Sequence, residues 1–149
     1  MYSVFEHFLM GEHVYTQTMM PVCEKHGLTY AELTVLMFLA NNPTLDTASD
    51  IVKCRNIAKS HVSISVHSLE ERGLITKEFR DGNRRSCHLC LTDLSSSIVN
   101  DGRGAQEQFK EMLFSGVLEN EKRTMTEILQ KIDRNIELCI KEGGTKHAK

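Results

Sequence analysis

Residues 44–92 carry the strongest structural signals in the chain, and their sequence is TLDTASDIVKCRNIAKSHVSISVHSLEERGLITKEFRDGNRRSCHLCLT. A capping threonine opens a short helix over about 47–54, and a second helix, from about 58 to 72, follows after a tight turn and ends at a glycine. Two strands, 74–80 and 86–92, surround a turn that contains Asp-Gly-Asn. Helix, turn, helix and hairpin in this order predict a winged helix-turn-helix with a two-stranded β-wing.

Amphipathic helices are expected on both sides of this stretch. The first covers about 2–25, with Pro21 bending or breaking it near its end, and a second follows over 30–41. Two more run over about 93–114 and 119–141. The last of them carries one apolar stripe, formed by Met125, Ile128, Leu129, Ile132, Ile136, Cys139 and Ile140.

The predicted fold class is therefore mainly α (α+β), in a chain of 149 residues that forms a single domain, 1–149. Residues 29–92 make up the winged helix-turn-helix, and Thr29 and Glu32 form a capping box at its start. The segments 1–27 and 93–142 are expected to be dimerisation helices.

Composition limits the class of protein. Hydrophobic residues make up 40% and charged residues 26%, which is typical of a globular protein and not of a disordered one. No run of 18 apolar residues is present, so no membrane span is expected, and the N-terminal segment lacks the basic region of a secretory signal. The five cysteines show no framework spacing, which indicates free thiols and a cytoplasmic location.

The net charge of −2 is unevenly distributed. Residues 51–92 contain eight Lys or Arg and four Asp or Glu, a balance of +4, which leaves −6 for the rest of the chain. A basic segment in an acidic chain is what a phosphate-binding face requires. A randomly mixed surface is the alternative.

The second helix of the motif has two distinct faces. At 100° per residue, Val62, Ser65, Val66 and Leu69 share the side expected to pack on the preceding helices. The opposite side carries short hydrogen-bonding groups, an imidazole and one isoleucine, all suited to reading base edges, while a lysine at the helix start suits a phosphate. The outward set is Lys59, Ser60, His61, Ser63, Ile64 and His67. An ordinary solvated helix face is the alternative.

The hairpin tip is basic. Arg84 and Arg85 stand there, and a guanidinium at this position can enter a narrow minor groove. Asp81 is placed to hold one of the two arginines by a bidentate pair. Together with the helix beside it, this tip predicts a second contact to DNA.

These residues resemble the MarR family of transcriptional regulators. The likeness is carried by LEERGLI at 69–75 after the outward-facing helix, by the wing at 81–86, and by a strand that ends at 91–92. Further on, LFSGVL at 113–118 is similar to the family's break between its last two helices. The resemblance covers nearly the whole chain, but the terminal helices match mainly by length and apolar spacing.

The resemblance implies a homodimer that binds a palindromic operator on double-stranded DNA, usually as a repressor, and that is released by a small ligand, a metal or thiol oxidation. By position, the outward set would face the major groove and Arg85 would enter the minor groove. The chain departs from the family pattern at Asn83, often Asp, and at Ile64, often polar. Asp81 is then the expected partner of Arg85.

Physical reasoning also favours a dimer. The terminal helices are apolar along one stripe, and the central winged unit is too small to cover them. Pairing two copies hides the stripes and sets the two outward-facing helices one DNA turn apart, roughly 34 Å. Intramolecular packing of the same helices is the alternative.

Other binding sites are weakly indicated. An effector pocket is expected between the first helix, the second and the helix after the wing, although its residues also suit plain core: Tyr15, Met19, Met37, Phe38 and Phe109. No cofactor is expected, nor a metal, because Cys87 and Cys90 point to opposite faces of a strand.

Three functions compete. The leading one is a sequence-specific DNA-binding transcriptional regulator. The second is a winged-helix module that binds protein and never DNA. The third, a thiol- or metal-dependent enzyme using Cys87, His88 and Cys90, lacks any supporting triad, phosphate loop or carboxylate pair, so the chain is not expected to be an enzyme.

Overall fold

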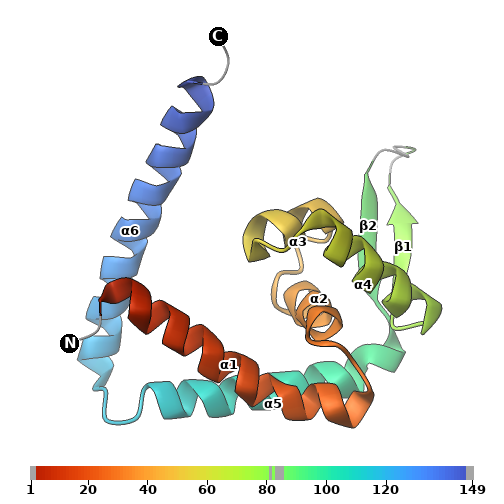
Figure 1. The fold of residues 1–149 in the computed structure, drawn as a ribbon, viewed down its shortest axis with the longest axis horizontal. Helices are drawn as coiled ribbons and strands as arrows, with labels where there is room; N and C mark the ends of the chain where they lie inside the picture. The colour runs from red at the N-terminus through yellow and green to blue at the C-terminus, as the bar shows by residue number, and fades with distance from the viewer. Residues whose placement is uncertain (1–2, 81, 83–85, 147–149) are drawn as a thin grey trace. The chain divides into compact units, whose positions relative to one another are not determined.

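The computed structural model describes residues 3–80, 82 and 86–146. It divides into two compact units, Met1–Glu111 and Met112–Lys149, and each is described by itself. The elements are, in order, α1 (Val4–His26), α2 (Tyr30–Asn41), α3 (Ala48–Arg55), α4 (Lys59–Glu71), β1 (Ile75–Phe79), β2 (Cys87–Leu91), a short 3-10 helix η1 (Asp93–Ser95), α5 (Ser96–Leu113) and α6 (Glu119–Lys146) (Figure 1). This order confirms the predicted mainly helical winged helix-turn-helix.

Helix α1 differs from its prediction at both ends. It begins at Val4, because the Ser3 hydroxyl accepts from the Glu6 amide at 3.2 Å and the Glu6 carboxylate accepts from the Ser3 amide at 2.6 Å. It also continues unbroken through Pro21. A mid-helix proline destabilises a helix by about 3 kcal/mol. Burial of Val22 and Cys23 in the core offsets this, so of the bend or break expected at Pro21, the break is wrong.

The two capping boxes predicted from the sequence are present. Thr29 and Glu32 cap α2 reciprocally, at 3.2 and 2.8 Å, and Thr47 and Asp50 cap α3 in the same way, at 3.2 and 3.1 Å. Each box satisfies two backbone N–H groups that a helix start would otherwise leave without a partner. These local interactions fix where both helices begin.

A glycine ends α4 as expected. Gly73 has φ 69°, a left-handed conformation that residues with a Cβ seldom adopt. Its amide donates to the Glu70 carbonyl at 2.9 Å, and the next amide, of Leu74, donates to the Leu69 carbonyl at 2.9 Å. This is a Schellman ending, and it turns the chain directly into β1.

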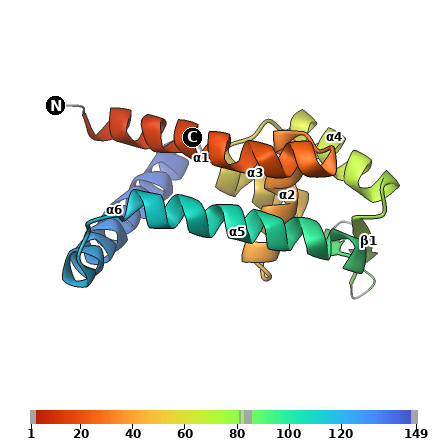
Figure 2. The same cartoon turned by 90° about the horizontal axis from the view of Figure 1, so that it is seen from below.

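The core of the first unit lies where α2, α3, α4 and the hairpin meet. Phe38, Ile51, Leu69 and Ile75 are all fully buried there, one from each of four consecutive elements. Helices α1 and α5 run alongside each other on the other side of α2 (Figure 2). The Tyr15 ring meets the Phe109 ring edge-on at 5.2 Å between centroids, which joins α1 to α5.

The hairpin is antiparallel and is joined to the loop before α3. Its register pairs Ile75 with Leu91 and Phe79 with Cys87. An isolated bridge links Thr47 to β2, and the Leu89 amide donates to the Asp46 carbonyl at 2.7 Å. Because both ends of the helix-turn-helix contact the hairpin, the wing is held beside α4 (Figure 1).

The second unit consists mainly of α6. The predicted break before it is confirmed, because Gly116 adopts φ 79° and the Leu118 amide donates to the Glu121 carboxylate at 2.8 Å. The apolar stripe along α6 is uncovered in the single chain, with side chains from Met125 to Ile140 between 37% and 68% exposed. None of the helices in the described ranges has the length and apolar character needed to cross a membrane.

Helices α2 and α5 approach each other closely at Gly102. A Cβ built there would lie 2.3 Å from the Met37 sulfur and 3.3 Å from its Cγ. Met37 is buried, so a Cβ at residue 102 would force its side chain to shift within the core. The absent side chain at residue 102 is therefore what lets α5 lie on α2.

We expect Gly102→Ala to lower the free energy of unfolding by about 1–2 kcal/mol, because overpacking of about 1–3 kcal/mol exceeds the helix propensity that alanine adds. Gly104→Ala is the matched control on the same helix, since a Cβ there meets nothing within 4 Å. It should stabilise the protein by up to about 1 kcal/mol. Urea unfolding measures both, and equal effects of the two substitutions would contradict the close contact.

Candidate nucleic-acid interface

Helix α4 presents two faces, as its sequence predicts. Val62, Ser65, Val66 and Leu69 are buried against the preceding helices. The outward set, Lys59, Ser60, His61, Ser63, Ile64 and His67, is exposed along the other side. Ile64 is 68% exposed, so it takes no part in the core and is free to contact a partner.

The start of α4 is open. Ala58 occupies the N-cap position, and its methyl side chain cannot accept a hydrogen bond. The N-cap side chain therefore leaves the first backbone amides of α4 uncapped. Uncapped amides at a helix start attract anions, and Lys59 adds a positive charge at the same end. The end of the outward face carries a carboxylate, since Glu71 lies 3.4 Å from the His67 imidazole. The phosphate-attracting end of α4 is its N-terminus.

A buried carboxylate fixes the position of α4. Glu32, at the start of α2, is only 8% exposed and accepts from the Ser68 hydroxyl of α4 at 2.5 Å. Arg72, just beyond α4, donates to the carbonyls of His26 and Gly27 at 2.9 and 3.0 Å. Helix α4 is thus tied to α1 and α2 through polar contacts as well as apolar packing.

The ionisation of Glu32 follows from these partners. Burial alone would raise the pKa of its carboxyl, but hydrogen bonds from Ser68 and Thr29, and the Arg72 guanidinium nearby, outweigh burial. The pKa therefore lies below the ordinary value, and the side chain is charged at neutral pH.

A second carboxylate holds the base of the wing. Asp46 accepts from Arg80 at 3.0 Å and from His88 Nδ1 at 2.6 Å, so it joins the loop before α3 to both strands. Burial opposes its ionisation, but the His88 hydrogen bond and the Arg80 charge keep its pKa below the ordinary value. The sequence gives no sign of this cluster, because its members lie far apart along the chain. The predicted wing residues Asp81, Arg84 and Arg85 lie outside the described residues.

A cavity of about 410 Å³ opens between α1, α2 and the end of α3. Of the five residues predicted for an effector pocket, Tyr15, Met19 and Met37 line it. Phe38 instead lies in the core beneath the Arg55 guanidinium, 5.5 Å from ring centroid to Cζ, and Phe109 packs on Tyr15. Sequence reasoning missed Glu12 and Arg55. Glu12 stands one helical turn before Tyr15, which was an available signal.

The cysteines form no shared site among residues 3–80, 82 and 86–146, where no three His, Cys, Asp or Glu side chains gather as metal ligands would. Burial raises the pKa of the Cys23 thiol. Burial also raises the pKa of Cys90, with Glu78 acting in the same direction. Raised pKa values disfavour the thiolate, which is the reactive form of cysteine.

The fold and the uncovered face of α4 define a winged-helix protein. The sequence profile of the MarR family matches residues 26–86, the segment that contains α2, α3, α4 and β1. The uncharacterized HTH-type transcriptional regulator YdgJ of Bacillus subtilis (strain 168) is 23% identical over 110 residues, which cover 74% of this chain and 66% of that protein.

Solved structures share the fold. The complex of S. aureus MepR with DNA aligns with a TM-score of 0.71 and 22% identity, and covers 91% of this chain and 99% of that one. Bordetella bronchiseptica BpsR, whose DNA binding is regulated by 6-hydroxynicotinic acid, aligns with a TM-score of 0.65 and 21% identity, over 88% and 99% of the two chains. Residues 26–86 of the chain thus match the MarR family model, and the chain as a whole shares the winged-helix fold of these solved structures.

We expect Glu32→Gln to lower the free energy of unfolding at pH 7 by about 1–3 kcal/mol, because it removes a charged acceptor from a buried network. The pKa of Glu32 is lower in the folded protein than in the unfolded chain, where it is about 4.3. The Glu32 charge therefore stabilises the folded protein at pH values above about 4.3, and this stabilisation is lost as the pH falls through the folded-state pKa. The difference between the two proteins should therefore shrink below pH 4.

Urea unfolding from pH 3 to pH 7 measures this difference, with the exposed Glu24→Gln on α1 as the control. A gap that stayed constant across the whole pH range would show that the Glu32 charge contributes nothing.

Proposed function

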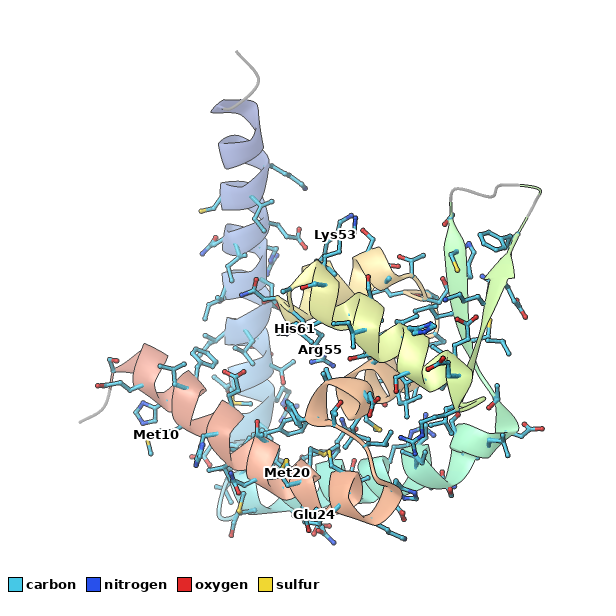
Figure 3. All side chains as sticks on the ribbon, turned by 45° about the vertical axis from the view of Figure 1, so that its right-hand side comes forward. Met10, Met20, Glu24, Lys53, Arg55 and His61 are labelled. Carbon is cyan, nitrogen blue, oxygen red and sulfur yellow. The ribbon has the colours of Figure 1, made fainter. Side chains whose placement is uncertain are left out.

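We propose that this protein is a sequence-specific DNA-binding regulator, not an enzyme, that acts as a homodimer on a palindromic operator. The observation that carries the proposal is the outward face of α4, where six side chains suited to base edges and phosphates are exposed. Figure 3 shows α4 beside the hairpin, with His61 labelled. The S. aureus MepR–DNA complex, which shares the fold, supports DNA binding.

In this proposal α4 enters the major groove. Lys59 and the open helix start contact phosphate, while Ser60, His61, Ser63, Ile64 and His67 face base edges. The Ile64 side chain suits a thymine methyl. Arg85 enters the minor groove, with Arg84 beside it and Asp81 as its partner. Phosphate contacts set the affinity, and base contacts set the preferred sequence.

The uncovered stripe on α6 supports the homodimer. Several isoleucines, a leucine and a methionine in one row leave a large apolar area in water if the chain stays alone. A second copy presents the same row, so a twofold contact covers both at once. Two recognition helices on one duplex then require an operator with twofold symmetry.

We further propose that DNA binding represses transcription and that a small molecule in the cavity between α1, α2 and α3 releases the operator. The cavity lies against α2, which also carries Glu32, and Glu32 holds α4. A ligand that displaces α2 would therefore displace the recognition helix. BpsR, whose DNA binding responds to 6-hydroxynicotinic acid, shares the fold and supports ligand control.

We expect weaker binding to every duplex, and binding that is less sensitive to salt, from each of Lys59→Ala and Arg85→Ala. Each substitution removes one cationic side chain that contacts a phosphate or enters the minor groove. The slope of log K against log salt should fall by roughly 0.9 per contact. Lys110→Ala on α5 removes the same charge away from α4 and is the control. Fluorescence anisotropy from 50 to 300 mM salt measures the slopes, and unchanged slopes would refute the proposed DNA face.

We expect Ser63→Ala and His67→Ala to change the preferred sequence more than the affinity for random DNA. Each lost base contact removes about 1–3 kcal/mol of discrimination between the preferred base and a wrong base. Selection from a random duplex pool gives the preferred sequence of each variant. The sequence selected by the unmodified protein is then placed at a reporter promoter to test repression. A pool that yields no enriched, twofold-symmetric sequence would favour a protein-binding winged helix instead.

Ile132→Asp should convert the dimer to a monomer, because it places a charge at the centre of the α6 stripe. Gln130→Asp adds the same charge on the opposite side of α6 and should leave the dimer intact. Sedimentation velocity distinguishes the two species. A wild-type protein that sediments as a monomer at micromolar concentration would exclude this assembly.

A further inference from the structure

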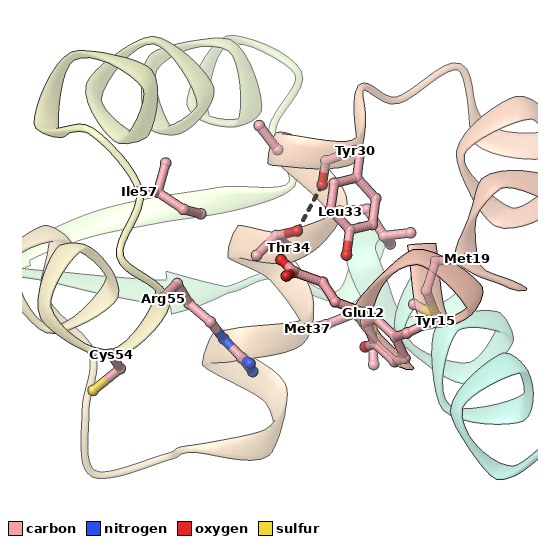
Figure 4. Close-up of a pocket in the computed structure, with 11 residues that line it drawn as sticks. Glu12, Tyr15, Met19, Tyr30, Leu33, Thr34, Met37, Cys54, Arg55 and Ile57 are labelled. Carbon is pink, nitrogen blue, oxygen red and sulfur yellow. Dashed lines mark hydrogen bonds between the residues drawn. The ribbon is translucent and has the colours of Figure 1, made fainter. Parts of the chain in front are cut away.

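Two opposite charges face the cavity between α1, α2 and α3. Glu12 enters it from α1 and Arg55 from the end of α3, and both side chains point into the same space (Figure 4). Neither forms an ion pair within 4.0 Å with any residue that the structure describes. The Arg55 guanidinium lies over the Phe38 ring, which orients it and leaves its N–H groups available.

The remaining walls are mostly apolar. Met19, Leu33, Met37 and Ile57 supply aliphatic surface, and two tyrosines add rings. The hydroxyl of Tyr15 already accepts from Gln106 at 2.7 Å, and that of Thr34 already donates to the Tyr30 carbonyl at 2.8 Å. Among the described residues that line this cavity, Glu12 and Arg55 are the charged side chains, and neither has an ion-pair partner; the Tyr30 hydroxyl and the Cys54 thiol are neutral groups that also remain available. The volume of about 410 Å³ is that of a small-molecule site.

A charge beside apolar surface needs a counter-charge when water is displaced. A simple acid would pair with Arg55 but would leave Glu12 uncompensated and would be repelled by it. A simple amine would pair with Glu12 and meet the same difficulty at Arg55. A molecule that carries both charges compensates both side chains, and like-charge contacts then reject its singly charged analogues.

We propose that the effector pocket of the regulator described above binds a small zwitterion. Its acidic group pairs with Arg55, its protonated amine pairs with Glu12, and its hydrocarbon body lies on the methionine and leucine side chains between them. The inference deepens the proposed ligand release by naming the chemical class of the ligand, and it rests on the cavity serving as the effector site.

The test measures binding by calorimetry and thermal shift in the absence of DNA. The probes are the standard amino acids with apolar side chains, 4-(aminomethyl)benzoate and straight ω-amino acids of four to eight carbons. Each is paired with the acid that lacks its amine and with the amine that lacks its acid. At least one zwitterion should bind about tenfold or more tightly than both of its singly charged analogues.

Variants identify the two contacts. Arg55→Gln should remove the advantage given by the acid group, and Glu12→Gln the advantage given by the amine. Lys53→Gln on α3 and Glu24→Gln on α1 are the controls, because both side chains are exposed and neither lines the cavity (Figure 3). If every zwitterion binds no better than its acid alone, or if Glu12→Gln leaves the advantage intact, the proposal is wrong.

Failure of this inference is distinguishable from failure of the proposed function. Retention on duplex DNA is measured without ligand and tests the function alone. A protein that binds DNA but prefers singly charged probes keeps its proposed function and loses the zwitterion. A protein that binds a zwitterion but no DNA keeps the site and loses the regulator.

Discussion

The position of α4 depends on a buried carboxylate at the start of α2. Glu32 accepts a hydrogen bond from Ser68 on α4 while it also caps its own helix. A carboxylate removed from water is stable only when its acceptor sites are satisfied, so this hydrogen bond favours keeping α2 and α4 together. The outward residues lie on the same short helix as Ser68. The hydrogen bond from Ser68 to Glu32 therefore helps to fix the direction in which they point. Apolar packing brings the helices together, but this contact sets their register.

Much of the first unit follows from local sequence signals. Capping boxes and the glycine ending of α4 join residues only three to five positions apart, so they are visible in the sequence alone. The two faces of α4 follow from helical geometry, and Val62 and Leu69 are buried as predicted. The start of α1 and its course through Pro21 were not predictable in this way, because the packing of Val22 and Cys23 outweighs the local cost of proline.

The sites are less visible because they join distant parts of the chain. Asp46 meets His88 across 42 positions, and no periodicity connects them. Arg55 enters the cavity because α3 ends against Phe38, which only the tertiary structure shows. By contrast, Tyr15, Met19 and Met37 were predictable as pocket residues, because apolar residues on facing helices must meet somewhere near the core. Charged residues need not lie near the core, so the sequence did not predict that Glu12 and Arg55 line the cavity.

The contact between Gly102 and Met37 links α5 to the shape of the cavity, because Met37 forms part of both. A larger residue at 102 is accommodated most easily if residue 37 becomes smaller, and that exchange would also change the wall of the cavity. The two positions should therefore change together during evolution. A relative could acquire a new ligand through such a paired substitution, with the outward face of α4 left untouched.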